Sequence, residues 1–176
     1  MKKGFSYGEM LMTIVIIGVI SAITIPIISQ TINDNIKPLY KSAFMNVETV
    51  VNELINDVSI YPSGEFANNT FCSNFFAKVN TIGAVQCTES FVSSPPDFPN
   101  AVTTNGMKWY YMDDRFDDSC PDGETGQCLK IQVDVNGSSG ANTTLGDDKD
   151  ILDIYIFQSG KVTVESGSTE ETHLLD

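Results

Sequence analysis

The sequence predicts an α+β domain in which a long N-terminal helix packs against an antiparallel sheet of three or four strands. Two observations support this prediction. Apolar residues first form a long run without a charged side chain and then recur with the spacing of one helix face, up to about residue 59. From residue 108 onward, apolar and polar residues alternate with a period of two, as they do in strands. A chain of 176 residues is long enough for one modest core.

The first part of the predicted helix is apolar. Residues 10–28 contain no charged side chain, and a helix of this length can cross a bilayer. Lys2 and Lys3 precede the run and acidic residues follow it, which predicts a cytoplasmic N-terminus. A cleaved secretory signal is disfavoured because no small-residue cleavage site follows the run. A plain signal anchor is an alternative, but it does not explain Glu9, a carboxylate within an apolar segment.

The stretch KKGFSYGEM, residues 2–10, resembles the processing signal of type IV prepilins and type II secretion pseudopilins. That family has a short basic leader ending in glycine, then phenylalanine, then glutamate as the fifth mature residue. The resemblance implies that prepilin peptidase cuts after Gly4 and methylates the amine of Phe5. It further implies a pilin fold, with a leader at 1–4, a transmembrane and filament-core helix at 5–29 and an extracellular head at 30–176.

The resemblance also assigns assembly roles to Phe5, Glu9, Gly18 and Pro26. An ion pair between Glu9 of one subunit and the Phe5 amine of its neighbour would set the stagger of the helices. Leaving either charge unpaired in an apolar medium is costly. Many pilins carry glycine and proline at the positions of Gly18 and Pro26. Because proline removes a backbone hydrogen bond, we expect a kink or an unwound stretch between these two residues.

Beyond the apolar run, the predicted helix becomes amphipathic and ends before residue 62. Its apolar stripe is expected to face a core and consists of Ile36, Leu39, Tyr40, Ala43, Val47, Val50, Val51, Leu54 and Val58. Residues 62–107 look irregular and resemble the loop that joins helix and sheet in pilins, the αβ-loop.

The sheet is expected between residues 108 and 165. Its predicted strands are 108–112, 129–135, 151–157 and 161–165, the last two forming a hairpin around Gly160. Trp109 and its two tyrosine neighbours could form an adhesive patch, but aromatic residues in a strand are usually packed. The tail after residue 165 is expected to be exposed.

The four cysteines are Cys72, Cys87, Cys120 and Cys128. They form no C-x-x-C pair and the chain has one histidine, His173, so a zinc site of the usual kind is disfavoured. An even number of cysteines behind an export signal predicts two disulfides formed in an oxidising compartment. Three pairings are possible, of which we expect the sequential one, Cys72–Cys87 and Cys120–Cys128.

The glycine-rich segment 134–150 contains many side-chain oxygens. Asp134, Asn136, Asp148 and Asp150 offer the ligands that calcium prefers, and the major pseudopilins hold calcium in a loop of this region. Calcium is therefore the one cofactor that the sequence suggests. The simpler alternative is that Asp and Asn favour turns.

Charge and motif content argue against two classes of function. The chain has 23 acidic and 10 basic residues and a net charge of −13, which disfavours direct binding of nucleic acid. One histidine supports no catalytic triad, and no glycine-rich phosphate loop is present, so the chain is not expected to be an enzyme.

The resemblance implies a structural subunit of a type IV pilus, major or minor, that polymerises through its N-terminal helix. The alternatives are a pseudopilin of a type II secretion system or a DNA-uptake pilin. The expected partners are further copies of the chain, prepilin peptidase, an inner-membrane assembly platform and, before assembly, the membrane itself. The expected location is the inner membrane, crossed once with a cytoplasmic N-terminus, and then an extracellular filament.

Overall fold

The computed structural model describes residues 7–8, 10–19, 36–87, 99–111, 115–118, 120–137 and 150–175. The chain divides into two units, Met1–Asn35 and Ile36–Asp176, and the second is called the head from here on. In the first unit, residues 7–8 and 10–19 are helical. The side chain of Thr13 donates a hydrogen bond of 2.8 Å to the carbonyl oxygen of Met10 within this helix.

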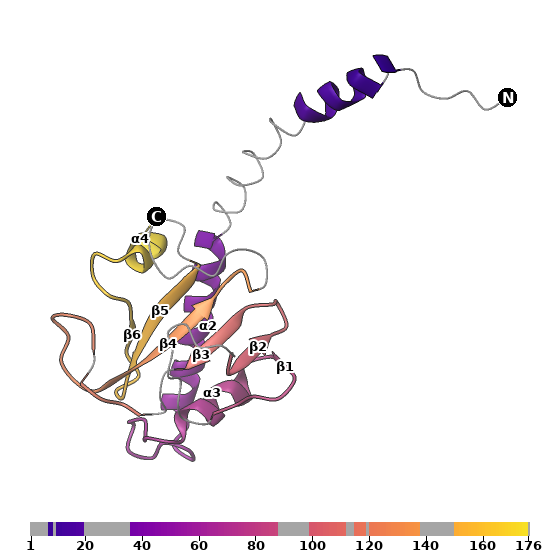
Figure 1. The fold of residues 1–176 in the computed structure, drawn as a ribbon. Coiled ribbons are helices and arrows are strands. Elements are labelled where there is room, and N and C mark those ends of the chain that lie inside the picture. Colours follow the sequence, from indigo (N-terminus) through magenta and orange to yellow (C-terminus); the bar gives the residue numbers. More distant parts are fainter. Residues whose placement is uncertain are drawn as a thin grey trace. The chain divides into compact units, whose positions relative to one another are not determined.

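The described part of the head contains a six-stranded antiparallel sheet in which each strand pairs with its neighbour in sequence (Figure 1). The strands are β1 (Thr81–Ile82), β2 (Ala101–Thr103), β3 (Lys108–Tyr111), β4 (Cys128–Asp134), β5 (Ile151–Phe157) and β6 (Val162–Thr163). The two longest strands, β4 and β5, pair along their whole length, from Cys128 opposite Phe157 to Asp134 opposite Ile151. This pair is the longest stretch of strand pairing in the described sheet.

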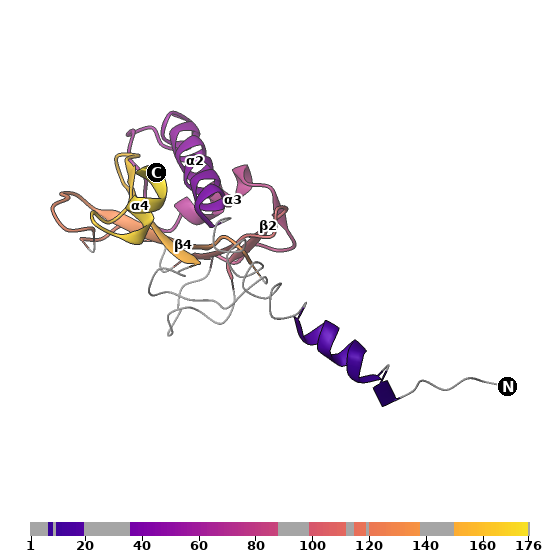
Figure 2. The same cartoon turned by 90° about the horizontal axis from the view of Figure 1, so that it is seen from above.

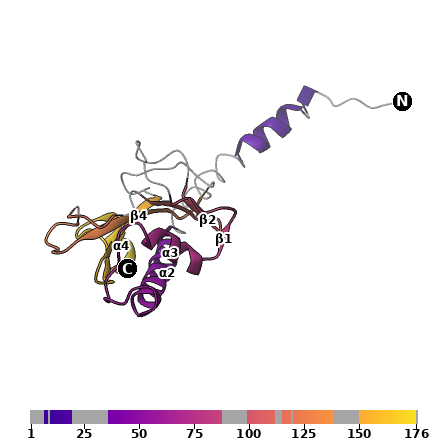
Figure 3. The same cartoon turned by 90° about the horizontal axis from the view of Figure 1, so that it is seen from below.

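Three helices cover one face of this sheet: α2 (Ile36–Ile55), α3 (Phe71–Lys78) and α4 (Thr169–Leu175) (Figures 2 and 3). The apolar stripe of α2 faces inward, and its buried residues are Ile36, Tyr40, Ala43, Val47, Val50, Val51 and Leu54. Alternate residues of the central strands complete the same core: Leu129, Ile131 and Val133 from β4 with Leu152, Ile154 and Ile156 from β5. The apolar face of the helix, which repeats every 3.6 residues, and the inward faces of the strands, which repeat every two, therefore pack together in one layer of side chains.

Aromatic rings fill the core beside α3. Phe66 lies 4.7 Å from Phe71 and 4.9 Å from Tyr61 between ring centroids, both edge to face. Trp109 exposes only 2% of its surface and packs 6.2 Å from Phe75. Because Trp109 and Tyr110 are both buried, these two aromatic residues of β3 belong to the core and not to a surface patch.

The expected pilin fold, built on one long N-terminal helix, is wrong for the residues that the structure describes. The helical residues 7–8 and 10–19 belong to the first unit, and the longest described helix, α2, has 20 residues and begins at Ile36. That helix ends at Ile55 and not near residue 59. A turn follows it, in which the N–H of Asp57 donates to the carbonyl of Leu54 and the Asp57 carboxylate accepts from Ser59. The sheet has six strands in place of three or four.

The expected transmembrane helix and the single passage through the inner membrane are also wrong by this structure. Among the described residues, no helix combines the length and the apolar content that crossing a bilayer requires. The longest described helix, α2, is amphipathic, since one of its faces is exposed and polar.

Several elements were not predicted. Residues 62–107, expected to be irregular, contain α3, β1 and β2. The tail, expected to be exposed, forms α4 and buries Glu170 and His173. The strands β3, β4 and β5 lie within one residue of their predicted bounds, while β6 is shorter than predicted.

Candidate functional site

Most residues predicted to act in processing and assembly cannot be placed. Gly4, Phe5, Glu9 and Pro26 lie outside the described residues. Gly18 is helical, and a Cβ at its position would meet no atom within 4 Å. Around it, eight apolar side chains between residues 10 and 19 each expose 49–69% of their surface in the single chain: Met10, Leu11, Met12, Ile14, Val15, Ile16, Ile17 and Val19. A run of exposed apolar side chains on one helix marks an interaction surface.

The head has both expected disulfides, Cys72–Cys87 and Cys120–Cys128. Cys72 is buried in α3, and Cys87 follows β1. The first bond therefore ties α3 to the chain segment beyond the edge strand of the sheet.

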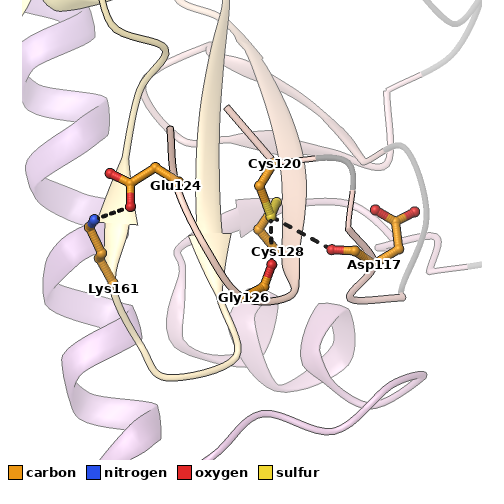
Figure 4. The surroundings of a disulfide bond; sticks show 6 residues. All are labelled: Asp117, Cys120, Glu124, Gly126, Cys128 and Lys161. Atoms are coloured by element: carbon orange, nitrogen blue, oxygen red, sulfur yellow. Dashed lines mark hydrogen bonds and ion pairs between the residues drawn. A yellow bond between two sulfur atoms is a disulfide. The ribbon is translucent and has the colours of Figure 1, made fainter. Parts of the chain in front are cut away.

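The second disulfide closes a loop at the start of β4 (Figure 4). Cys128 and Asp117 exchange two backbone hydrogen bonds of 2.8 and 2.9 Å. The Sγ atom of Cys120 lies 3.2 Å from the carbonyl oxygen of Gly126 and 3.6 Å from that of Asp117. Backbone pairing and the disulfide together fix both ends of the loop.

One ion pair connects this loop to the β5–β6 hairpin. The Nζ atom of Lys161 lies 2.5 Å from Oε2 of Glu124 (Figure 4). The same atom lies 5.4 Å from the centroid of the Phe157 ring. Both charged side chains are partly exposed, so this pair adds little stability. The disulfide and the ion pair together brace this loop at the surface of the head.

Three of the four residues predicted to bind calcium gather in a buried corner at the ends of β4 and β5. Asp134 is fully buried and Asp150 exposes 1% of its surface, and Asn136 lies between them in sequence. Lys108 of β3 joins them because it pairs with Asp134 in the strand register. Asp148 lies outside the described residues. We call Lys108, Asp134, Asn136, Gly137 and Asp150 the polar corner.

Hydrogen bonds in the polar corner leave two oxygens without a donor. The Oδ1 atom of Asp134 accepts the N–H of Gly137 at 2.7 Å, and Asn136 Nδ2 donates to Asp150 Oδ2 at 2.9 Å. Lys108 Nζ donates to the Gly137 carbonyl at 3.2 Å and lies 3.9 Å from Asp134 Oδ2. Within the described part of the head, the buried atoms Asp134 Oδ2 and Asn136 Oδ1 accept no hydrogen bond.

Two further properties define this corner. Burial raises the pKa of Asp134 to about 6, against the lowering effects of the Gly137 N–H and of Lys108. Gly137 has φ = 63°, and any Cβ there would overlap the carbonyl oxygen of Gly106. The position therefore requires glycine, which in turn allows the backbone to reach Asp134 and Lys108.

The described residues of the polar corner provide only part of the ligand set that calcium needs. Calcium takes about six to eight oxygen ligands, whereas this corner offers two oxygens that lack donors. The ammonium group of Lys108 already supplies a positive charge beside Asp134. Among the described residues, no group of three or more His, Cys, Asp or Glu side chains is placed to hold a metal. Calcium binding stays a prediction.

A second buried polar cluster, which was not predicted, joins α2, α4 and β5. The hydroxyl of Tyr40 donates to the backbone carbonyl of Asp153 at 2.8 Å, and Glu170 Oε1 accepts the backbone N–H of Asp153 at 3.0 Å. The ring of His173 lies edge-on to that of Tyr40 at 6.2 Å, and neither ring nitrogen has a hydrogen-bond partner among the described residues. Burial lowers the pKa of His173 and raises that of Tyr40.

A sequence signal for α4 exists in the form of a capping box. Ser168 Oγ accepts the N–H of Glu171, and Glu171 Oε2 accepts the N–H of Gly167. The pattern Ser-x-x-Glu at residues 168–171 therefore marks the start of a helix that places Glu170 and His173 on its inner side. The cluster fastens the end of the chain to the core, and its one imidazole has no nucleophile or carboxylate hydrogen-bonded to it.

Comparisons of the chain with family models, with curated proteins and with solved structures found no match.

Proposed function

We propose that this chain is a structural subunit that is processed at a prepilin-type signal and polymerises through its N-terminal segment into a type IV pilus. The observation that supports this most is the helical stretch 10–19, whose eight large apolar side chains are all exposed in the single chain. Burying them requires another molecule, and burial of apolar surface is the main driving force of protein association.

The sequence before this stretch supplies the register of assembly. Cleavage after Gly4 would leave a cationic amine on Phe5, four residues before the carboxylate of Glu9. In a bundle of apolar helices, each of these charges needs an opposite charge from a neighbouring subunit. The pairing favours one stagger between subunits over all others, as a helical filament requires.

The proposal concerns processing and assembly, and it requires neither the continuous helix nor the membrane span that were expected. Two properties of the head support it. Two disulfides are typical of a protein that functions in an oxidising compartment. The head also has a closed core of its own, so it can be carried on a filament as an independent unit.

Mass spectrometry and electron microscopy of sheared filaments test the proposal. We expect filaments that contain this chain, with a mature N-terminus at Phe5 that carries a methyl group. The variant Glu9→Ala should express and fold its head normally but give a much lower filament yield. Ser6→Ala, which removes a polar side chain from the same segment without removing a charge, is the matched control. An unprocessed N-terminus, or normal filament yield with Glu9→Ala, would contradict the proposal.

The alternative is a pseudopilin of a type II secretion system. The two disulfides favour a pilus subunit, because the major pseudopilins usually lack them. Filament length separates the two: long fibres composed mainly of this chain identify a major pilus subunit. Short or absent fibres, together with loss of protein secretion when the chain is deleted, identify the pseudopilin.

A further inference from the structure

The head contains a pocket of about 200 Å³ between α2, α3 and the β2–β3 hairpin. Its lining residues are Asn46, Val50, Phe75, Lys78, Val79, Asn80, Thr103, Thr104, Asn105 and Trp109.

Apart from Lys78, the polar part of the lining consists of neutral hydrogen-bonding groups. The lining contains three asparagine amides and two threonine hydroxyls. None of the ten described lining residues is acidic, although the chain has 23 acidic residues. The side chains of Asn46 and Asn80 are exposed and make no hydrogen bond within the described part of the head. They are therefore available to a ligand.

The apolar part of the lining is rigid. Val50, Phe75 and Trp109 are buried core residues. The indole Nε1 of Trp109 donates to Thr103 Oγ1 at 3.3 Å, which fixes the ring relative to β2. The Cys72–Cys87 disulfide brackets the segment that contains Val79 and Asn80 and restrains it. A preformed wall of this kind costs little ordering entropy when a ligand binds.

The charges of the residues that line the pocket favour a neutral ligand. Lys78 is the one cationic residue among the lining residues that the structure describes, and its Nζ atom lies 3.8 Å from Oε2 of Glu53. Because this ammonium group already has a carboxylate partner, the pocket offers no unpaired charge to an anion. A volume of about 200 Å³ is also smaller than the ~300–1,000 Å³ of sites for drug-sized molecules.

We propose that this pocket binds one neutral sugar ring, such as the terminal hexose or N-acetylhexosamine of a glycan. The amides of Asn46 and Asn80 each present a donor and an acceptor side by side, which matches the neighbouring hydroxyl groups of a sugar. The Oδ1 atom of Asn105 is not counted, because it already accepts from Thr103 Oγ1. The apolar wall matches the C–H face of the ring, and the size of the pocket suits a single ring. This inference goes beyond filament assembly and does not depend on it, since every lining residue belongs to the head.

The test is binding of free monosaccharides to the full chain, purified in detergent, by saturation-transfer NMR and calorimetry. The probes are glucose, galactose, mannose, N-acetylglucosamine and N-acetylgalactosamine, with glucuronic acid and N-acetylneuraminic acid as charged probes. We expect at least one neutral sugar to bind with a dissociation constant in the millimolar range, as small polar ligands do. Asn46→Ala and Asn80→Ala should each weaken binding about 3- to 10-fold, the effect of losing one hydrogen bond.

Asn52→Ala is the matched control, because Asn52 is exposed on the same helix but does not line the pocket. It should leave binding unchanged, and circular dichroism should show all three variants folded. Failure of every neutral sugar to bind the folded chain would overturn the proposal. Equal binding by the wild type, Asn46→Ala and Asn80→Ala would overturn it as well, and binding of the acidic sugars alone would overturn the assignment of a neutral ligand.

Discussion

Lys108 and Asp134 form an ion pair in which the two partners differ in exposure. The carboxylate is fully buried, whereas the lysine side chain exposes 23% of its surface. Their separation of 3.9 Å is long for a hydrogen bond, so the interaction is mainly coulombic. A buried carboxylate with a distant cation is costly to ionise, which is why the pKa of Asp134 is raised.

The first prediction concerns Lys108→Met. At pH 7 we expect this variant to lose about 1–3 kcal/mol of stability, because ionised Asp134 loses the cation beside it. At pH 5 the loss should be smaller, since Asp134, with a pKa of about 6, is then largely protonated. Urea unfolding followed by Trp109 fluorescence, in the presence of a chelator, measures both values.

Lys130→Met is the control for this experiment. Lys130 lies 3.6 Å from Asp153 on the same sheet, but that carboxylate exposes 20% of its surface and water can solvate it. The control should therefore lose less stability at pH 7 than Lys108→Met. Equal losses at pH 5 and pH 7 for Lys108→Met would contradict the account of the polar corner.

Calcium provides a second prediction for the same residues. Because Lys108 supplies the positive charge in the wild type, we expect calcium to raise the melting temperature of Lys108→Met more than that of the wild type. The double variant Lys108→Met/Asp134→Asn should lose this response. Magnesium, which demands stricter octahedral geometry, serves as the control ion. No response of Lys108→Met to millimolar calcium would remove the predicted calcium site.

His173 makes the stability of the head depend on pH in the sense opposite to Asp134. Its folded pKa is lowered, mainly by burial, so the folded state favours the neutral ring. Stability is therefore lost as the pH falls below about 6.5, the ordinary pKa of histidine, towards the folded value. Asp134 acts in reverse: its raised pKa makes the head more stable as the pH falls from about 6 towards about 4.

The variant His173→Phe separates the two contributions. Phenylalanine keeps the edge-on contact with Tyr40 and removes two buried nitrogens that lack partners. We expect a smaller loss of stability between pH 7 and pH 5.5 than in the wild type. The other charged or titratable groups around the ring, Lys37, Asp153 and Glu170, are unchanged. Identical pH profiles of the two proteins, measured by thermal unfolding, would contradict this role for His173.

At the scale of elements, the sequence predicts the helices and strands that are long enough to show a pattern of apolar residues. The apolar stripe of α2 extends over a helix of 20 residues, and β4 and β5 each have seven residues, so all three were predicted. By contrast, β1 and β2 have two and three residues, and α3 has eight, too few to show a period. Strand register explains why Lys108 was missed: its pairing with Asp134 depends on how β3 aligns with β4.

The two disulfides are expected to differ in their effect on stability. In the loop-entropy description, a bond across 15 residues contributes about 3 kcal/mol and one across 8 residues about 2.5 kcal/mol. Cys72 is also fully buried in the aromatic core, whereas Cys120 is partly exposed. We therefore predict that Cys72→Ala/Cys87→Ala lowers the urea midpoint more than Cys120→Ala/Cys128→Ala. A larger effect of the second pair would mean that the loop before β4 contributes more to the core than its exposure indicates.

At the scale of the whole molecule, the division into two units predicts independent behaviour. The head contains the buried core, both disulfides and the whole described sheet, whereas the helical residues 10–19 expose their apolar side chains. A fragment of residues 30–176 should therefore unfold in one cooperative transition and remain monomeric. The full chain should unfold its head at the same temperature but self-associate, because association is driven by the apolar surface before residue 20. Analytical ultracentrifugation and calorimetry of the two proteins measure this difference.

Adding the paired substitutions Ile14→Ser and Ile17→Ser to the full chain should reduce its association without moving the transition of the head. If the fragment associates as strongly as the full chain, assembly depends on the head and not on the N-terminal segment.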